Sequence, residues 1–297
     1  MRQYVAGAVV THRYRAAVLG SPIAHSLSPV LHRAAYQRLG FTGREYGAFE
    51  VDERALPGFL AGLDRAQWSG LSLTMPLKRA IIALVDEVSG TAQAVGAVNT
   101  VVFADDGTLR GDNTDVPGLV AALAERGIRR ARSAAVLGGG ATAASAVAAL
   151  ASIVGRDGTV EVYVRSLSRA EQLMPTAERV GVTLRVRAWK EAGDSLLRHE
   201  LVVNTTPAGA ADELAAVAEN AVAQKAFGTL FDVLYHPWPT PLAAVWERAG
   251  AVVLGGLDLL IHQAALQVEL MTGADPALHD TVVAAMRAAG NAALTER

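Results

Sequence analysis

Short apolar runs alternate with longer amphipathic segments along most of the chain. The first series comprises three strands and two helices, expected at residues 16–19, 28–39, 44–51, 53–63 and 70–74. Strands that alternate with helices in this way are typical of an α/β domain with a largely parallel sheet. The pattern therefore predicts one such domain in the first part of the chain.

A second alternating series begins at residue 134. Beyond the unit at 134–164, its strand-like runs lie at residues 183–186, 201–204 and 230–233. Two final segments, 258–272 and 276–293, have helical periodicity with no strand between them. A helix within residues 115–132 would connect the two series, which indicates a second α/β domain followed by helices.

Residues 134–164 form the most informative unit. An apolar run, a Gly138-Gly139-Gly140 turn, a helix of small residues and a β-branched run follow one another, as in a βαβ crossover. Gly138 permits the tight turn, Gly140 allows a pyrophosphate to approach the backbone, and Ala143 is small enough for close helix packing. The pattern G-x-G-x-x-A favours a dinucleotide site, with a turn that only packs as the alternative.

The end of the second strand of this unit indicates which dinucleotide binds. An Asp or Glu there would bond the free ribose 2′-hydroxyl of NAD, but this chain has Arg165, Ser166 and Arg169. Two guanidinium groups and a hydroxyl suit a 2′-phosphate, so NADP is the expected cofactor. Two solvated arginines beside a helix start are the alternative interpretation.

Composition agrees with two domains and excludes several functional classes. The chain has 297 residues, of which 51% are hydrophobic and 19% charged, enough for a core in each domain. Its net charge of −2 gives no footprint for nucleic acid or for a membrane surface, and no apolar run approaches a transmembrane span. Cysteine is absent, which fits a reducing compartment, and we expect a cytoplasmic protein.

Polar residues in the first series stand at the ends of predicted strands. Ser28 is a natural helix N-cap before Pro29, and Ser26 is not needed for capping, so the pair could present hydroxyls to a ligand. Lys78 lies just inside a helix start, where the dipole disfavours a cation. Asn99 offers an amide, and Asp115 offers a carboxylate unless it is an ordinary N-cap.

These motifs, taken together, resemble those of the shikimate dehydrogenase family from about residue 15 onward. The family's Ser-x-Ser pair matches Ser26 and Ser28. Its further motifs match, in order, residues 72–78, 96–100, 113–118, 204–209, 232–242 and 256–264. The sequence departs from the family at four positions, where Ser72, Ala141, Val164 and Asp258 replace the usual residues.

The resemblance implies a role for each matched residue. Lys78 and Asp115 would form the catalytic pair that interconverts 3-dehydroshikimate and shikimate in aromatic amino-acid (chorismate) biosynthesis. The substrate would be held by Ser26, Ser28, Thr74, Asn99, Gln263 and Tyr235. The NADP site would comprise Gly138, Gly139, Gly140, Ala141, Thr142, Arg165, Ser166, Arg169, Thr205, Val233 and Gly256.

We therefore expect two α/β domains with the substrate in the cleft between them. Residues 1–118, completed by 258–297, would bind the substrate, and residues 119–257 would form a Rossmann-type NADP domain. A quinate or aminoshikimate dehydrogenase is the enzymatic alternative, and Arg165 and Arg169 speak against an NAD-preferring quinate enzyme. A catalytically silent NADP-binding sensor is the alternative from another class.

Other residues carry no further chemistry in this interpretation. His25, His32, His236 and His262 lack the spacing of metal ligands, so no metal is expected. The alanine-rich segment 282–294 would cover the first domain. A homodimer contact through this segment is the alternative, and the sequence does not select between them.

Overall fold

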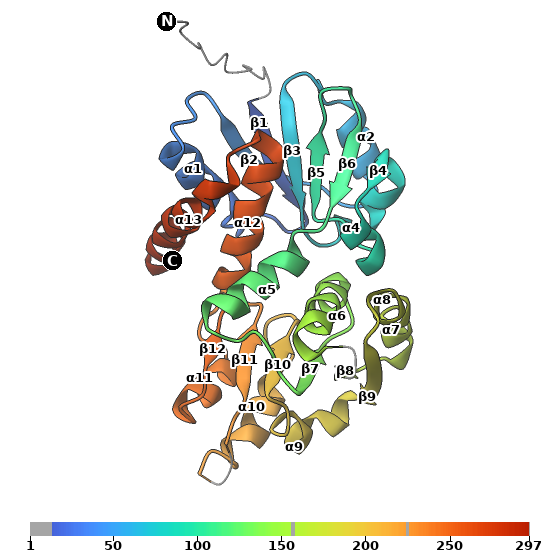
Figure 1. The fold of residues 1–297 in the computed structure, drawn as a ribbon, viewed down its shortest axis with the longest axis vertical. Coiled ribbons are helices and arrows are strands. Elements are labelled where there is room, and N and C mark those ends of the chain that lie inside the picture. The colour runs from blue at the N-terminus through green and yellow to red at the C-terminus, as the bar shows by residue number, and fades with distance from the viewer. Residues whose placement is uncertain (1–13, 156–157, 224–225, 297) are drawn as a thin grey trace, which may run out of the picture.

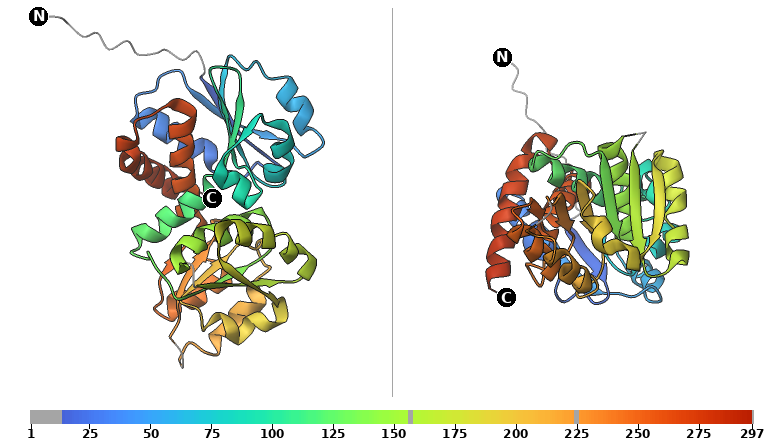
Figure 2. Two further views of the ribbon diagram at one scale, coloured as in Figure 1. Left: turned by 45° about the vertical axis from the view of Figure 1, so that its right-hand side comes forward. Right: turned by 90° about the horizontal axis from the view of Figure 1, so that it is seen from below.

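Two sheets organise the molecule, one in each half (Figure 1). The computed structural model describes residues 14–155, 158–223 and 226–296, and within these residues each sheet has six strands. Figure 2 shows the two halves stacked end to end, with the helix α5 (Asp115–Glu125) crossing between them. The two α/β halves confirm the expected fold class.

The first sheet has the strand order β2-β1-β3-β5-β6-β4. Its strands are β1 (Arg15–Gly20), β2 (Glu45–Glu50), β3 (Trp68–Leu73), β4 (Glu87–Val88), β5 (Thr100–Phe103) and β6 (Leu109–Asp112). The three predicted strands are present, and β1 pairs in parallel with both β2 and β3. The sheet is nevertheless mixed, because β5 runs antiparallel to both β3 and β6. The hydrophobic pattern missed this hairpin because each of its strands is only four residues long.

The antiparallel strand β5 decides where three chain segments meet. Thr100, at the start of β5, pairs with Ser72 near the end of β3 and with Asp112 at the end of β6. The segments that follow β3, precede β5 and follow β6 therefore lie at one edge of the sheet. A parallel β5 would have placed Asn99 at the opposite edge.

The second sheet is wholly parallel, with the order β12-β11-β10-β7-β8-β9. Its strands are β7 (Ser133–Leu137), β8 (Thr159–Val164), β9 (Thr183–Ala188), β10 (Leu201–Asn204), β11 (Thr229–Asp232) and β12 (Val253–Leu254). The chain winds outward from β7 through β8 to β9, and then from β10 on the other side of β7. This is the Rossmann order, whose ligand crevice lies at the switch point between β7 and β10.

Helices cover both sheets and return the chain to the first one. In the first half they are α1 (Ser28–Arg38), α2 (Leu56–Ala61), α3 (Leu77–Ala80) and α4 (Gly90–Val95). In the second half they are α6 (Ala141–Val154), α7 (Leu167–Glu171), α8 (Met174–Val180), α9 (Ala192–Leu196), α10 (Asp212–Glu219) and α11 (Pro241–Arg248). The last two, α12 (Gly256–Thr272) and α13 (His279–Thr295), pack with α1 against the first sheet, as expected (Figure 1). None of the helices in the described ranges is long and apolar enough to cross a bilayer.

The start of α1 corrects one prediction. Ser28 is the first residue of the helix rather than its N-cap, which is Leu27, and the Ser28 side chain makes no capping bond. Instead the Ser26 hydroxyl accepts a hydrogen bond from the Ser28 backbone N–H at 3.3 Å. Ser26, and not Ser28, therefore accepts a hydrogen bond from a backbone N–H at the start of the helix. The helix can begin at Ser28 because Pro29 fits the second helical position as well as the first.

His32 is a buried residue of α1. Its Nδ1 lies 2.9 Å from the Ser28 carbonyl oxygen, and its ring stacks on Tyr46 with 3.7 Å between centroids. The Nε2 atom is buried and has no hydrogen-bond partner among the described residues. Burial lowers the pKa of His32 to about 4, so the ring is neutral at neutral pH.

Replacement of Gly118 by Ala should push α5 away from α12. A Cβ there would lie 2.9 Å from the Gln263 backbone nitrogen and 3.0 Å from its Cβ, a contact that only a backbone shift can relieve. We expect Gly118→Ala to lower the free energy of unfolding by about 2 kcal/mol. Gly58→Ala in α2, where a Cβ meets no neighbour within 4 Å, is the matched control and should not destabilise. Equal denaturant midpoints for the two variants would contradict the close packing.

Acid should destabilise the protein through His32. The unfolded chain binds a proton below about pH 6.5, whereas the folded ring resists protonation until about pH 4. Stability is therefore lost as the pH falls from 6.5 to 4, by about 3 kcal/mol from this residue. Urea unfolding across that range should show a shallower loss for His32→Gln than for the wild type. Parallel curves would rule out His32 as the source.

Candidate active site

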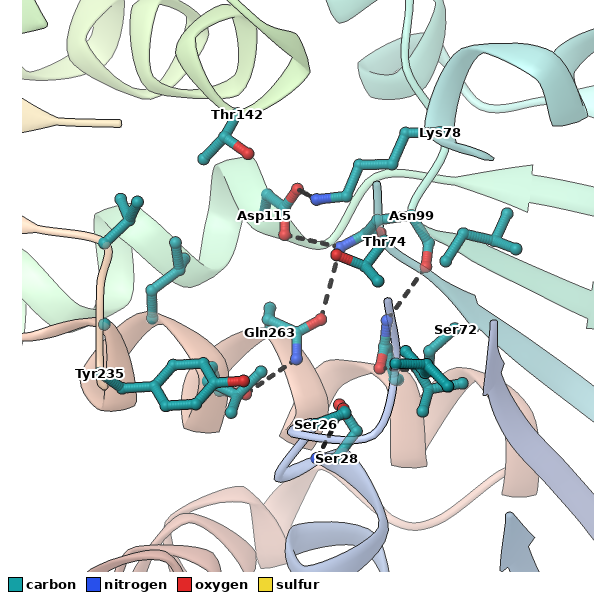
Figure 3. A pocket seen from close by; sticks show the side chains of 18 of the residues that line it. Ser26, Ser28, Ser72, Thr74, Lys78, Asn99, Asp115, Thr142, Tyr235 and Gln263 are labelled. Atoms are coloured by element: carbon teal, nitrogen blue, oxygen red, sulfur yellow. Dashed lines mark hydrogen bonds and ion pairs between the residues drawn. The ribbon is translucent and has the colours of Figure 1, made fainter. Parts of the chain in front are cut away.

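One cavity between the two halves collects all eight residues predicted to bind or convert the substrate (Figure 3). It has a volume of about 280 Å³ and also reaches Thr142, Val233 and Gly256 of the second half. A space of this size suits a small polar molecule together with one end of a larger cofactor.

The shortest polar contact in the cavity joins Lys78 to Asp115. The Lys78 Nζ lies 2.6 Å from the Asp115 Oδ2, and the two side chains are only 13% and 8% exposed. Lys78 is the second residue of α3, and Asp115 is the first residue of α5. Asp115 is not an N-cap, since Thr114 holds that position and Asn113 Oδ1 accepts from the Val116 N–H instead. Its carboxylate is therefore available to the lysine.

Asn99 completes the surroundings of the carboxylate. Its Nδ2 donates to the other Asp115 oxygen, Oδ1, at 2.8 Å and to Thr114 Oγ1 at 3.0 Å. Its Oδ1 accepts from the Thr114 backbone N–H and from the Thr100 hydroxyl, each at 2.8 Å. Both oxygens of Asp115 thus have a charged or polar donor, which a buried carboxylate requires.

Hydroxyl groups lie at the other end of the cavity. Figure 3 shows Ser26 and Ser28 below the ring of Tyr235 and well separated from Lys78. Thr74 follows β3 and is half-buried beside Asn99, while Gln263 extends from α12 toward the middle. The Gln263 Oε1 lies 3.4 Å from Asn99 Nδ2, and its Nε2 donates to the Leu260 carbonyl at 2.8 Å.

Tyr235 comes from the second half and reaches across to the first. Its hydroxyl donates to the His25 carbonyl oxygen at 3.4 Å. The segment that carries it is held by buried Asp232, which accepts from Asn204, Thr240 and the Leu234 N–H. Burial raises the pKa of Asp232, and these donors oppose the rise.

The predicted cofactor residues share one edge of the second sheet. Except for Arg169, they lie in or just beyond the turns that follow the strands: Gly138 to Thr142 after β7, Arg165 and Ser166 after β8, Thr205 after β10, Val233 after β11 and Gly256 shortly after β12. Arg169 lies in α7, and its side chain is outside the described part of the structure. This edge holds the carboxyl ends of the strands, where ligands of such sheets bind.

The turn after β7 has the shape of an anion cradle. Gly138 has a φ of 111°, and a Cβ there would meet Thr205 Oγ1 at 2.6 Å, so only glycine fits. A Cβ at Gly140 would meet nothing within 4 Å, and no side chain caps the 14-residue helix α6 that follows. The free N–H groups of its first turn can therefore bind a pyrophosphate.

The remaining cofactor residues have simpler surroundings. Arg165 is exposed, and Ser166 is the N-cap of α7 with its hydroxyl 2.8 Å from that of Ser168. Gly256 permits α12 to begin directly against the preceding loop, because a Cβ would lie 2.1 Å from the Val233 carbonyl oxygen. These positions fit a dinucleotide that extends from Arg165 toward the cavity.

The cavity wall also includes residues that the sequence did not indicate as site residues, among them the polar Ser72 and Gln267. Ser72 stands where the family motif has another residue. Gln267 lies one helical turn after Gln263, so the spacing of the two glutamines on one helix face could have identified it. Among the described residues, no group of three or more His, Cys, Asp or Glu side chains is arranged to hold a metal.

Two family models match the chain. The model for the shikimate dehydrogenase substrate binding domain matches residues 18–101, and that for the shikimate 5'-dehydrogenase C-terminal domain matches residues 256–289. The chain is also 37% identical to the shikimate dehydrogenase (NADP(+)) of Methylobacterium radiotolerans, over 91% of this chain and 96% of that protein.

Solved structures of shikimate dehydrogenases are also similar to this chain. The shikimate dehydrogenase of Mycobacterium tuberculosis is 40% identical, with a TM-score of 0.81 over 92% of this chain and 99% of the other. The shikimate 5-dehydrogenase of Thermus thermophilus, solved with NADP(H) and shikimate, is 34% identical with a TM-score of 0.76, over 93% and 99% of the two chains.

Proposed function

The chain belongs to the shikimate dehydrogenase family, and from this premise we propose how its residues carry out the reaction. It is an NADP-dependent oxidoreductase that interconverts 3-dehydroshikimate and shikimate in the biosynthesis of aromatic compounds. The observation that carries the assignment of residues is the buried Lys78–Asp115 pair, 2.6 Å apart in the wall of the cavity.

The Lys78–Asp115 pair transfers the proton. Bound NADP supplies or accepts the hydride of the reaction. Reduction of the ring carbonyl places negative charge on its oxygen, and the Lys78 ammonium, at hydrogen-bond distance from it, stabilises that charge and donates the proton. Asp115 holds the ammonium in place. In the opposite direction the pair accepts the proton, and because the two groups are coupled they act as a unit.

The two ends of the cavity recognise different groups of the substrate. Ser26 and Ser28 offer neutral hydroxyl donors suited to the carboxylate, with Tyr235 closing that end, and Thr74 offers its hydroxyl beside Asn99. The Asp115 carboxylate would repel a second anion, so the ring hydroxyls lie nearer to it, between Asn99 and Gln263. This orientation brings the reacting carbon toward Lys78 and Thr142.

The cofactor would lie along the edge of the second sheet. The Gly138–Gly140 turn and the first turn of α6, with Gly139, Ala141 and Thr142, would hold the pyrophosphate. Arg165, Ser166 and Arg169 would hold the 2′-phosphate. Thr205, Val233 and Gly256 would border the nicotinamide end, and Val233 and Gly256 also line the cavity.

Several expectations stay predictions. These are the domain bounds 1–118 with 258–297 and 119–257, a homodimer through the C-terminal helix, and a cytoplasmic location. The first thirteen residues of the first domain lie outside the described residues. The buried proton-transfer pair favours an enzyme over a silent sensor, because binding alone does not require it.

Replacement of Lys78 by Ala should abolish most of the turnover. Loss of the proton donor and of the positive charge should lower kcat by about 10³-fold, with a change in KM for shikimate of less than about fivefold. Steady-state kinetics with NADP measure both constants. Lys190→Ala, which removes an exposed lysine that does not line the cavity, is the control. An unchanged kcat would remove Lys78 from the mechanism.

Substrate and cofactor preference can be measured in one experiment. Shikimate or quinate is supplied with NADP or NAD in all four combinations, and the absorbance of the reduced nicotinamide is followed. We expect turnover chiefly with shikimate and NADP, and a rise of about tenfold or more in KM for NADP, but not for NAD, in Arg165→Ala. Quinate with NAD as the best pair would overturn both preferences, and no turnover in any combination would favour the sensor.

A further inference from the structure

A row of buried side chains runs beside the cavity from β2 to α5. It begins at Tyr46 on β2, passes Ser72 at the end of β3 and Gln267 on α12, and reaches Thr100 and Asn99 at the start of β5. Of these five residues, only Asn99 belongs to the proposed substrate site. Figure 3 shows Ser72 and Asn99 along one wall of the cavity, with Asp115 beyond Asn99.

The number of donor hydrogens on each side chain gives the hydrogen bonds along this row a single direction. The Tyr46 hydroxyl donates to Ser72 Oγ at 2.6 Å, and Ser72, with one hydroxyl hydrogen, donates to Gln267 Oε1 at 2.7 Å. The Gln267 Nε2 then donates to Thr100 Oγ1 at 2.9 Å and to the Asn99 carbonyl oxygen at 3.3 Å. Both polar atoms of the Gln267 amide are thus used by protein groups, although the residue borders the cavity.

The direction of the row matches the orientation of the Asn99 amide, which the Thr114 N–H and the Asp115 carboxylate also favour. Thr100 accepts from Gln267 and donates its one hydrogen to Asn99 Oδ1 at 2.8 Å, where the Thr114 N–H also donates. The Asn99 Nδ2 therefore faces Asp115 Oδ1 at 2.8 Å. A reversed amide would set an oxygen against the carboxylate that holds Lys78, and the two would repel each other.

We propose that Gln267, fixed by Ser72 and Tyr46, is a positioning residue that orients the Asn99 amide and through it the Lys78–Asp115 pair. This inference rests on the proposed function of that pair. The first member is itself immobile, because the Tyr46 ring stacks on His32 at an interplanar angle of 17°. Hydrogen bonds in such a chain polarise one another, so loss of one member weakens the rest.

Two variants interrupt the row at different points. Gln267→Met keeps the length of the side chain but removes all three hydrogen bonds of its amide, and should lower kcat about 10- to 100-fold. Tyr46→Phe removes only the first hydrogen bond of the row, from the Tyr46 hydroxyl to Ser72, and should lower kcat about three- to tenfold. In both, KM for shikimate should change less than about threefold, since neither residue has a polar atom free for the substrate.

Tyr36→Phe is the matched control for Tyr46→Phe. Tyr36 is also a buried tyrosine beside His32, but its hydroxyl has no hydrogen-bond partner. The kcat of Tyr36→Phe should stay within about twofold of the wild-type value. The primary isotope effect on kcat, measured with shikimate deuterated at the oxidised carbon, should rise in Tyr46→Phe and not in Tyr36→Phe, because a slower chemical step then limits turnover more strongly.

Thermal unfolding of each variant separates positioning from folding. If Gln267→Met fails to fold, the comparison of the two tyrosine variants alone decides whether the row has a positioning role. A Tyr46→Phe enzyme that matches Tyr36→Phe in kcat and isotope effect overturns the proposal, as does a Gln267→Met enzyme in which only KM rises. Both results presuppose a wild type that oxidises shikimate with NADP. A wild type without turnover would contradict the proposed function itself.

Discussion

The buried ion pair between Lys78 and Asp115 is the constraint on which the rest of the first half depends. Either charge alone would be costly to bury at this site, so the starts of α3 and α5 must meet with both side chains aligned. That meeting requires the segments after β3 and after β6 to emerge at one edge of the sheet. The antiparallel β5 achieves this and adds Asn99 between them.

The second half brings its residues together through a different sheet topology. A wholly parallel sheet places the carboxyl ends of all its strands on one edge, and its chain reversal between β7 and β10 opens a crevice there. The uncapped start of α6 lies at that crevice and faces the cavity through Thr142. The groups proposed to bind phosphate and those proposed to transfer the proton therefore reach one cavity from the two sheets.

The helix α12 joins the two halves through close backbone approaches. It begins against the Val233 carbonyl at Gly256 and packs against α5 at Gly118, positions where a side chain would collide. Between these contacts and the first sheet it carries Gln263 and Gln267 to the cavity wall. One helix thus connects Gly256, proposed to border the nicotinamide, with Gln263 in the cavity wall and with the Asn99 amide.

Local patterns determined much of this protein. The apolar runs of β1, β7 and β10, the Gly138–Gly140 turn and the residues after β8 all express short-range preferences, so the two α/β halves and the residues proposed to hold NADP followed from the sequence. The eight residues proposed to bind or convert the substrate stand in motifs that resemble the family, and they line one cavity. What they do together depends on contacts between segments 149 to 210 residues apart, which no local preference encodes.

Only the tertiary structure decided three features. Ser28 looked like an N-cap, but the helix starts one residue earlier, so its side chain lies in the cavity without a capping bond. The short strands of the β5–β6 hairpin give too weak a periodic signal, yet their pairing brings Asn99 to Asp115. Tyr46, Ser72 and Gln267 come from three elements, and their single hydrogen-bond direction exists only when all three are packed together. The sequence determined which groups are present, and the packing of distant elements determined which atoms they face.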